Sequence, residues 1–189
     1  LFSCRLTVLG DAGQSVNPYG SSTSDMIRRV FVSGEVMKLN KSYRSTYEIT
    51  DFAQQIRAND ELEVIERHGD IPVIQSFKNE KEETDGIMNL IRDFKYSNNK
   101  SLGIICKDEA QAAELYTTLK TSVKDIYFLS CESSVFVNGI IITSAHMAKG
   151  LEFDEVIISA VTHKNYLTEI DRSMLYVAVT RAMHRLTLT

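Results

Sequence analysis

What this sequence of 189 residues lacks narrows its class before any motif is considered: it has no tryptophan, 2 prolines and 3 cysteines. It contains no internal repeat, low-complexity tract or long linker, which excludes repeat arrays and flexible tethers. Cys4, Cys106 and Cys131 follow no metal-ligand spacing, which argues against a zinc module. Because Cys106 and Cys131 lie in or beside apolar runs, we expect buried free thiols in a reducing compartment, the cytoplasm.

Long apolar runs are absent as well. The longest fall far short of the roughly 18–20 residues that a membrane span needs, and no signal peptide is visible, so we expect no membrane partner. An excess of positive charge is also missing, because the net charge is −4 and the pI is near 5.6. That balance neither predicts nor excludes a nucleic-acid partner, since a local basic rim can work on an acidic body.

The composition that remains is that of an ordinary globular domain. With 43% hydrophobic and 24% charged residues, a single domain over residues 1–189 can bury a full core. The chain starts on Leu1 rather than Met, and it stops on strand-like residues, Arg185–Thr189. We therefore expect it to be part of a longer protein.

Apolar β-branched runs alternate with amphipathic segments along the chain. Several of the runs are apolar on both faces, which is typical of strands in a parallel sheet. This alternation predicts a doubly wound, mainly parallel sheet in a three-layer α/β/α fold. The expected strands are Arg5–Leu9, Val36–Leu39, Ile71–Phe77, Leu102–Cys106, Ile126–Leu129, a run from Ile140, Val156–Val161 and Arg185–Thr189, and the expected helices begin near Ser24, Thr46, Asn79, Asp108 and Ile170.

Two polar clusters lie in the first quarter of the chain. In Gly10-Asp-Ala-Gly-Gln14, Asp11 could lie near a metal-bound phosphate and Gln14 could orient a water; the alternative is a simple turn with an Asp cap. In Ser42-Tyr-Arg-Ser45, Arg44 is suited to a two-point phosphate contact and Tyr43 to stacking on a base. The alternative for this second cluster is a surface arginine beside a half-buried tyrosine.

The third cluster follows the strand that begins at Ile140. Gly150 permits close backbone approach, and Glu152 can accept a hydrogen bond from a sugar hydroxyl. Ser144 and His146 can contact a nucleic-acid backbone or base, although a lone histidine is more often structural. Polar turns after parallel strands are where such sheets place ligands.

The fourth cluster is Tyr176-Val-Ala-Val-Thr-Arg-Ala182. Arg181 lies toward the end of a helix whose inner face is already filled, so we expect its side chain to point at a cleft. The alternative is that the cation simply interacts with the negative end of the helix dipole.

Taken in order, the clusters resemble the motifs of the C-terminal, RecA-like motor domain of superfamily 1 helicases of the UvrD/PcrA/Rep type. Gly10–Ser15 resembles the third motif of that family and Leu39–Thr46 the fourth. Ser144-Ala-His-Met-Ala-Lys-Gly-Leu-Glu-Phe153 resembles the fifth, and Tyr176–Ala182 the sixth. Four ordered matches that span nearly the whole chain imply an ATP-dependent DNA helicase or translocase.

The resemblance implies a role for each matched residue. ATP would be contacted by Gln14, Tyr43, Arg44, Gly150, Glu152 and Arg181. Of these, Gln14, Arg44 and Arg181 would act in catalysis, with both arginines at the γ-phosphate. Single-stranded DNA would be contacted by Ser144 and His146, and by Tyr19, which stands where many relatives have a tryptophan.

The chain also departs from the whole-enzyme pattern. It has no Gly-x-x-x-x-Gly-Lys-Ser/Thr phosphate loop and no acidic pair for Mg²⁺, which the family carries on a preceding motor domain. We therefore expect ATP and Mg²⁺ to bind between this domain and that N-terminal domain, and this chain alone to be inactive.

Two other functions stay open at the level of sequence. The Lys41–Ala53 run resembles the HelD-like branch, which implies RNA polymerase as the partner of an ATP-driven remodelling factor. A degenerate motor domain kept as an interaction module is the second alternative, and the presence of Gln14, Arg44, Glu152 and Arg181 argues against it.

Overall fold

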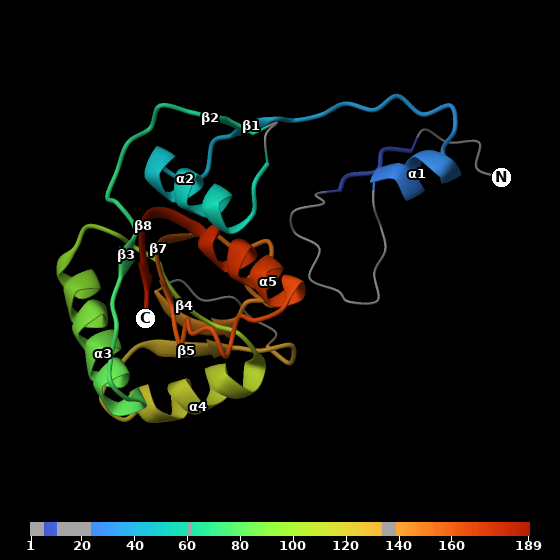
Figure 1. Cartoon of the computed structure of the whole chain (residues 1–189). Helices are drawn as coiled ribbons and strands as arrows, with labels where there is room; N and C mark the ends of the chain where they lie inside the picture. Colours follow the sequence, from blue (N-terminus) through green and yellow to red (C-terminus); the bar gives the residue numbers. More distant parts are fainter. Residues whose placement is uncertain (1–5, 11–23, 60–61, 134–138) are drawn as a thin grey trace.

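The computed structural model describes residues 6–10, 24–59, 62–133 and 139–189. Its centre is a six-stranded sheet with the order β3-β8-β7-β4-β6-β5, in which every pairing is parallel (Figure 1). The predicted doubly wound, mainly parallel sheet is therefore confirmed. The strands are β3 Val73–Ile74, β4 Leu102–Cys106, β5 Ile126–Leu129, β6 Ile140–Ser144, β7 Phe153–Ile158 and β8 Ala182–Leu188.

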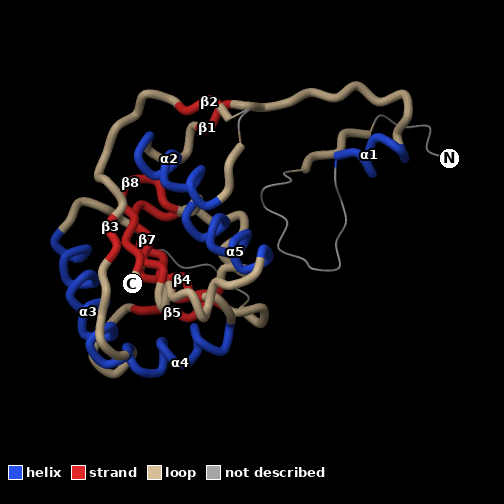
Figure 2. Tube along the Cα trace, viewed as in Figure 1, coloured by secondary structure: helices blue, strands red, loops and turns tan. Residues whose placement is uncertain are grey.

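Helices cover both faces of this sheet and make the three layers (Figure 2). One face carries α2 (Tyr47–Ile56) and α5 (Glu169–Val179), and the other carries α3 (Glu80–Tyr96) and α4 (Glu109–Leu119). Neighbouring residues of one strand enter different cores, so Ile105 packs in the core of α2 and α5 and Ile104 in that of α3 and α4. Burial on both faces explains why these strands are continuous apolar runs.

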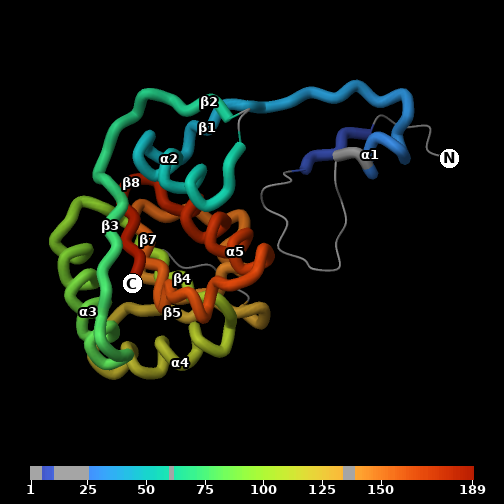
Figure 3. Tube along the Cα trace, in the orientation of Figure 1, coloured from blue at the N-terminus to red at the C-terminus, as the bar shows by residue number. Residues whose placement is uncertain are grey.

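The strand predicted over Arg5–Leu9 is wrong over its described residues, Leu6–Leu9, and so is the one predicted at Val36–Leu39, because neither stretch forms a strand. Met37 is 86% exposed and Leu39 is 85% exposed, so no sheet covers these apolar residues. This N-terminal part, with the short helix α1 (Ser24–Val30), stands away from the sheet (Figure 3). A run of residues with high strand propensity forms a stable strand only beside neighbouring strands, and none of the described residues forms a strand next to these two runs.

Further strand pairing near this part of the chain involves residues that were not predicted. A two-stranded parallel sheet joins β1 (Lys41–Ser42) to β2 (Glu63–Val64). The strand predicted over Ile71–Phe77 is present only as Val73–Ile74, at the edge of the large sheet.

The helices over the sheet begin close to the predicted residues. The side chain of Asn79 accepts from the amide of Glu82, and that of Asp108 accepts from the amide of Gln111. Thr46, where a helix start was predicted, is the N-cap of α2, but its hydroxyl makes no cap hydrogen bond. These caps depend on residues three or fewer positions away, which explains why local sequence predicts them.

The cysteine prediction is half right. Cys106 is a buried free thiol whose Sγ lies 3.1 Å from the hydroxyl of Ser159, whereas Cys131 is free and exposed. Burial raises the pKa of Cys106 to about 12, so this thiol stays protonated and inert at neutral pH. Among the described residues, no helix is long and apolar enough to cross a membrane.

Candidate functional site

The segment from Ser144 to Phe153 connects opposite edges of the sheet. It leaves β6 at the carboxyl edge and enters β7 at the amino edge, because both strands run parallel to β4 between them. Ala145 and Ala148 are fully buried beneath α2 and α5, so the crossover lies against that face of the sheet. Residues at its start and at its end therefore project toward different sides of the domain.

Packing at the end of this crossover requires a glycine in the neighbouring strand. A Cβ at Gly103 of β4 would lie 2.5 Å from Cδ2 of Phe153, closer than real Cβ contacts allow. The bare backbone of Gly103 lets the Phe153 ring lie on the sheet, where it is fully buried. This contact anchors the residue that directly follows Glu152.

A cleft of about 680 Å³ opens at the amino edge of β7 and β8. It is bounded by the 39–45 stretch, by α2, by the start of β7 and by the last turn of α5. Tyr43, Arg44 and Glu152, which the sequence assigns to nucleotide, all line it. The other lining residues are Leu39, Lys41, Ser42, Ser45, Ile49, Thr50, Ala53, Gln54, Leu62, Tyr176 and Thr180.

Arg44 and Glu152 meet across this cleft although 108 positions separate them. Nε of Arg44 lies 2.5 Å from Oε1 of Glu152, and the two side chains are 33% and 46% exposed. A partly exposed ion pair contributes little to stability, so the pair can open without much loss. Arg44 therefore has a donor fork at the cleft and a partner that an anionic ligand could replace. Tyr43 is 67% exposed beside it, with its ring accessible.

Arg181 is placed differently from the prediction. The residue is only 1% exposed, so its side chain does not point into the open cleft. Its Nε donates to the carbonyl of Val177 at 3.0 Å, and its terminal nitrogens lie 3.3 Å from the carbonyl of Leu151 and 3.1 Å from the hydroxyl of Thr180. In this conformation Arg181 caps the carboxyl end of α5, which is the alternative given above, a cation at the negative end of the helix dipole. It also connects that end of the helix to the crossover.

Of the two other predicted nucleotide residues, Gly150 is described by the structure and does not line the cleft. Gly150 is exposed and has a φ of +89°, a left-handed conformation that favours glycine. This turn is what lets the chain reverse before Glu152. Gln14, with Tyr19 and Asp11, lies outside the described residues.

Two of the three predicted DNA residues, Ser144 and His146, lie at the carboxyl edge, where β6 ends. His146 is exposed, whereas Ser144 is only 4% exposed and its hydroxyl lies 3.4 Å from the amide of Met147. Ser144 therefore shapes the turn, and His146 is the side chain that can reach a ligand. Beside them, Lys107 after β4 pairs with Asp171 at the start of α5 at 2.8 Å.

Asp171 fixes this carboxyl edge. It closes a capping box, accepting from the amide of Thr168 at 2.9 Å while Thr168 accepts from the amide of Asp171 at 3.2 Å. Burial by itself raises the pKa of Asp171, but the hydrogen bonds from Lys107 and Thr168 outweigh it and lower the pKa to about 2. The start of α5 is thus closed by its own carboxylate.

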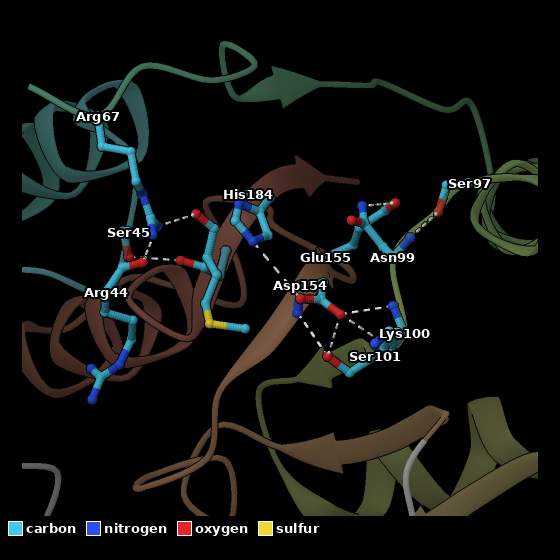
Figure 4. Close-up of polar contacts among 12 residues, drawn as sticks. Arg44, Ser45, Arg67, Ser97, Asn99, Lys100, Ser101, Asp154, Glu155 and His184 are labelled. Atoms are coloured by element: carbon cyan, nitrogen blue, oxygen red, sulfur yellow. Dashed lines mark hydrogen bonds and ion pairs between the residues drawn. The ribbon is translucent and has the colours of Figure 1, made fainter.

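At the amino edge, Asp154 organises the starts of the strands (Figure 4). Its carboxylate accepts from the amides of Lys100 and Ser101 at 2.7 and 2.9 Å, and the hydroxyl of Ser101 accepts from the amide of Asp154 at 2.8 Å. Burial raises the pKa of Asp154, yet these hydrogen bonds leave it below its usual range. His184 lies 3.9 Å away. The edge that carries Glu152 is therefore rigidly hydrogen-bonded.

Sequence reasoning missed several lining residues of the cleft. Gln54 lies on α2, and Tyr176 and Thr180 lie four positions apart on the last turns of α5. Their helical spacing places Tyr176 and Thr180 on one face, which could have signalled a shared surface. In the described ranges, no group of three or more His, Cys, Asp or Glu side chains is placed to hold a metal ion.

Fold and site together define a class: a three-layer α/β/α domain of the RecA-like type with an arginine-bearing cleft at one sheet edge. Comparison with known proteins supplies the family. The profile described as "UvrD-like helicase C-terminal domain" matches residues 139–189, which include the crossover and β8. No curated protein matches the chain.

A solved relative extends that match over most of the chain. The crystal structure of the C-terminal domain of a possible DNA helicase from Lactobacillus plantarum WCFS1 has 33% identity and a TM-score of 0.67, over 78% of this chain and 86% of that one. A fainter likeness, to the arterivirus nonstructural protein 10 helicase solved with DNA, has 16% identity and a TM-score of 0.38, over 61% of this chain and 28% of that one. The chain belongs to the UvrD-like helicase C-terminal domain family.

Proposed function

We propose that this chain is the second motor domain of an ATP-dependent helicase or translocase that moves on single-stranded DNA. ATP binds in the amino-edge cleft, against a preceding domain that supplies the phosphate loop and the ligands of Mg²⁺. DNA lies at the carboxyl edge, near His146. The crossover from Ser144 to Phe153 connects the two ligands.

The observation that carries this proposal is the meeting of Arg44 with Glu152 at the cleft. Phosphoryl transfer is catalysed largely by positioned positive charge, which Arg44 can offer once an anion replaces the carboxylate. Glu152 is then free to accept from a ribose hydroxyl, and the exposed ring of Tyr43 can stack on the base. Each of these roles uses a side chain that lines one cleft.

Arg181 enters the proposal as a second cation that must leave its helix cap to reach a phosphate. Its terminal nitrogens contact the carbonyl of Leu151, next to Glu152, so a shift of the crossover alters the cap. Nucleotide binding at Glu152 and release of Arg181 are thereby coupled through two adjacent residues.

The test is the DNA-stimulated ATPase of the full-length protein carrying Arg44→Ala. We expect kcat to fall by roughly 10³-fold, because one arginine on the transferring phosphoryl group is removed. The affinity for single-stranded DNA without nucleotide should stay within about twofold, since Arg44 lies at the other edge of the sheet.

Arg92→Ala is the matched control, because Arg92 is an exposed arginine of α3 that covers the opposite face of the sheet. It should leave both kcat and DNA affinity unchanged. An Arg44→Ala protein that hydrolyses ATP at the wild-type rate would remove Arg44 from the nucleotide site and overturn the proposal.

A further inference from the structure

The stretch Arg67–Gly69, which we name the clamp segment, contacts both parts of the chain that carry the candidate catalytic arginines, Arg44 and Arg181. The guanidinium of Arg67 donates from one terminal nitrogen to the carbonyl of Arg44 and to the carbonyl of Met183, the latter at 3.0 Å. Met183 follows Arg181 by two residues. One side chain therefore connects the backbone of Arg44 to the start of β8 (Figure 4).

A second hydrogen bond also connects the Arg44 region to the start of β8. The hydroxyl of Ser45 donates to the carbonyl of Ala182 at 2.6 Å, and both residues are buried. Ser45 and Arg67 thus fix the backbone of Arg44 on the two residues that follow Arg181. The Nε of Arg67 is buried and has no partner among the described residues, so its hold rests on the terminal nitrogen.

The rest of the clamp segment is fastened to the start of α2. Glu48 accepts from the amide of Gly69 at 2.9 Å and lies 2.8 Å from Nδ1 of His68, and the amide of Tyr47 donates to the carbonyl of Arg67 at 2.8 Å. A Cβ at Gly69 would lie 2.6 Å from Cγ2 of Thr46, so this approach requires glycine. These contacts fix the backbone of the clamp segment against the start of α2, and thereby the point from which the Arg67 side chain extends.

We propose that Arg67 is a positioning residue that acts through Arg44: it sets the spacing between Arg44 and the Arg181 turn, and thereby the geometry of the two cations at the phosphate. The guanidinium itself contacts no ligand. This inference rests on the proposed ATPase function, and it assigns a role to a segment outside every motif that the sequence singled out. A misplacement of about 1 Å in a reacting group can cost on the order of 100-fold in rate.

The experiment is a double-mutant cycle in the full-length protein, with DNA-stimulated kcat as the readout. Arg67→Ala should lower kcat by roughly 10- to 100-fold while KM for ATP changes less. Because Arg67 acts through Arg44, adding Arg67→Ala to Arg44→Ala should change kcat by no more than about twofold. Arg67→Lys, whose ammonium can still donate to both carbonyls, should recover a large part of the rate.

Two results overturn the inference while ATPase activity stands: multiplicative effects of Arg67→Ala and Arg44→Ala, or no recovery in Arg67→Lys. If Arg67→Ala does not fold, the cycle is run with Ser45→Ala, which removes the bond to Ala182 and should likewise be silent in the Arg44→Ala background. A wild-type protein without ATPase activity overturns the proposed function and this inference together. Multiplicative effects of the two substitutions on kcat, in a protein that does hydrolyse ATP, overturn only the inference.

Discussion

The two edges of the sheet differ in how they are built. The amino edge carries a cleft lined by Arg44 and Glu152, with the buried Arg181 cap outside that lining. Asp154 holds the strand starts at the same edge. The carboxyl edge offers an exposed His146, while the Lys107–Asp171 pair closes the start of α5. One edge therefore resembles a prepared binding site, and the other a surface over which a strand can move.

This difference suits the proposed task. A nucleotide must be held in one geometry for hydrolysis, whereas a translocating strand must be gripped and released in turn. The crossover reaches both edges in a few residues, and the proposed function requires that it transmit a displacement at Glu152 to His146. Its buried alanines, Ala145 and Ala148, let this short segment pass between the sheet and the helices α2 and α5.

The largest effect on stability is expected from a substitution of Arg181, at the amino edge of the sheet. Arg181→Ala leaves the carbonyl of Leu151 without its arginine donor, removes one donor from the carbonyl of Val177, which keeps the hydroxyl of Thr180, and opens a cavity, so we expect a loss of roughly 3 kcal/mol in unfolding free energy. Urea denaturation of this chain measures that loss. Unfolding free energies of wild type and variant that agree within error would mean that Arg181 is not the cap seen here.

The next largest effect on stability is expected from a substitution of Asp171, at the carboxyl edge of the sheet. Asp171→Asn removes an ion pair with Lys107 and should lower unfolding free energy by roughly 2 kcal/mol at pH 7. Because folding lowers the pKa of Asp171 from 3.8 to about 2, its contribution is present above pH 3.8 and is lost as the pH falls toward 2. The gap between wild type and variant should narrow over that range. Equilibrium unfolding across pH 2–7 tests this, and a gap independent of pH contradicts it.

The smallest effect on stability is expected at Glu152. Glu152→Gln keeps the shape of the side chain and breaks only an exposed pair with Arg44, so unfolding free energy should change by less than about 0.5 kcal/mol. The same variant should raise KM for ATP in the full-length protein. A large loss of stability with an unchanged KM would assign Glu152 to the fold instead of the cleft.

The sequence predicted the central architecture because that information is local. The bounds of β4 and β5 follow from apolar runs, and the starts of α3 and α4 from the Asn79 and Asp108 caps. The Leu6–Leu9 and Val36–Leu39 strands were wrong because strand propensity says nothing about whether a neighbouring strand is present. The sequence places Ser144 and Glu152 at opposite ends of one segment, and the structure brings those ends to opposite edges of the sheet.

The geometry of the site was harder to predict. The direction of Arg181 depends on carbonyls of Val177 and Leu151 that only the folded chain brings near it. Arg67 carried no motif signal, because its partners Arg44 and Met183 lie 23 and 116 positions away. Long-range contacts of this kind are set by packing, and no local sequence pattern predicts them.

The central claim is that one crossover couples nucleotide at the amino edge to DNA at the carboxyl edge. The most direct measurement is the affinity of the full-length protein for a single-stranded oligonucleotide, with and without a non-hydrolysable ATP analogue, in wild type and Arg44→Ala. We predict that the analogue changes the wild-type affinity by roughly 5- to 150-fold and that Arg44→Ala abolishes most of that change. An affinity that is the same with and without the analogue in the wild-type protein would contradict the coupling.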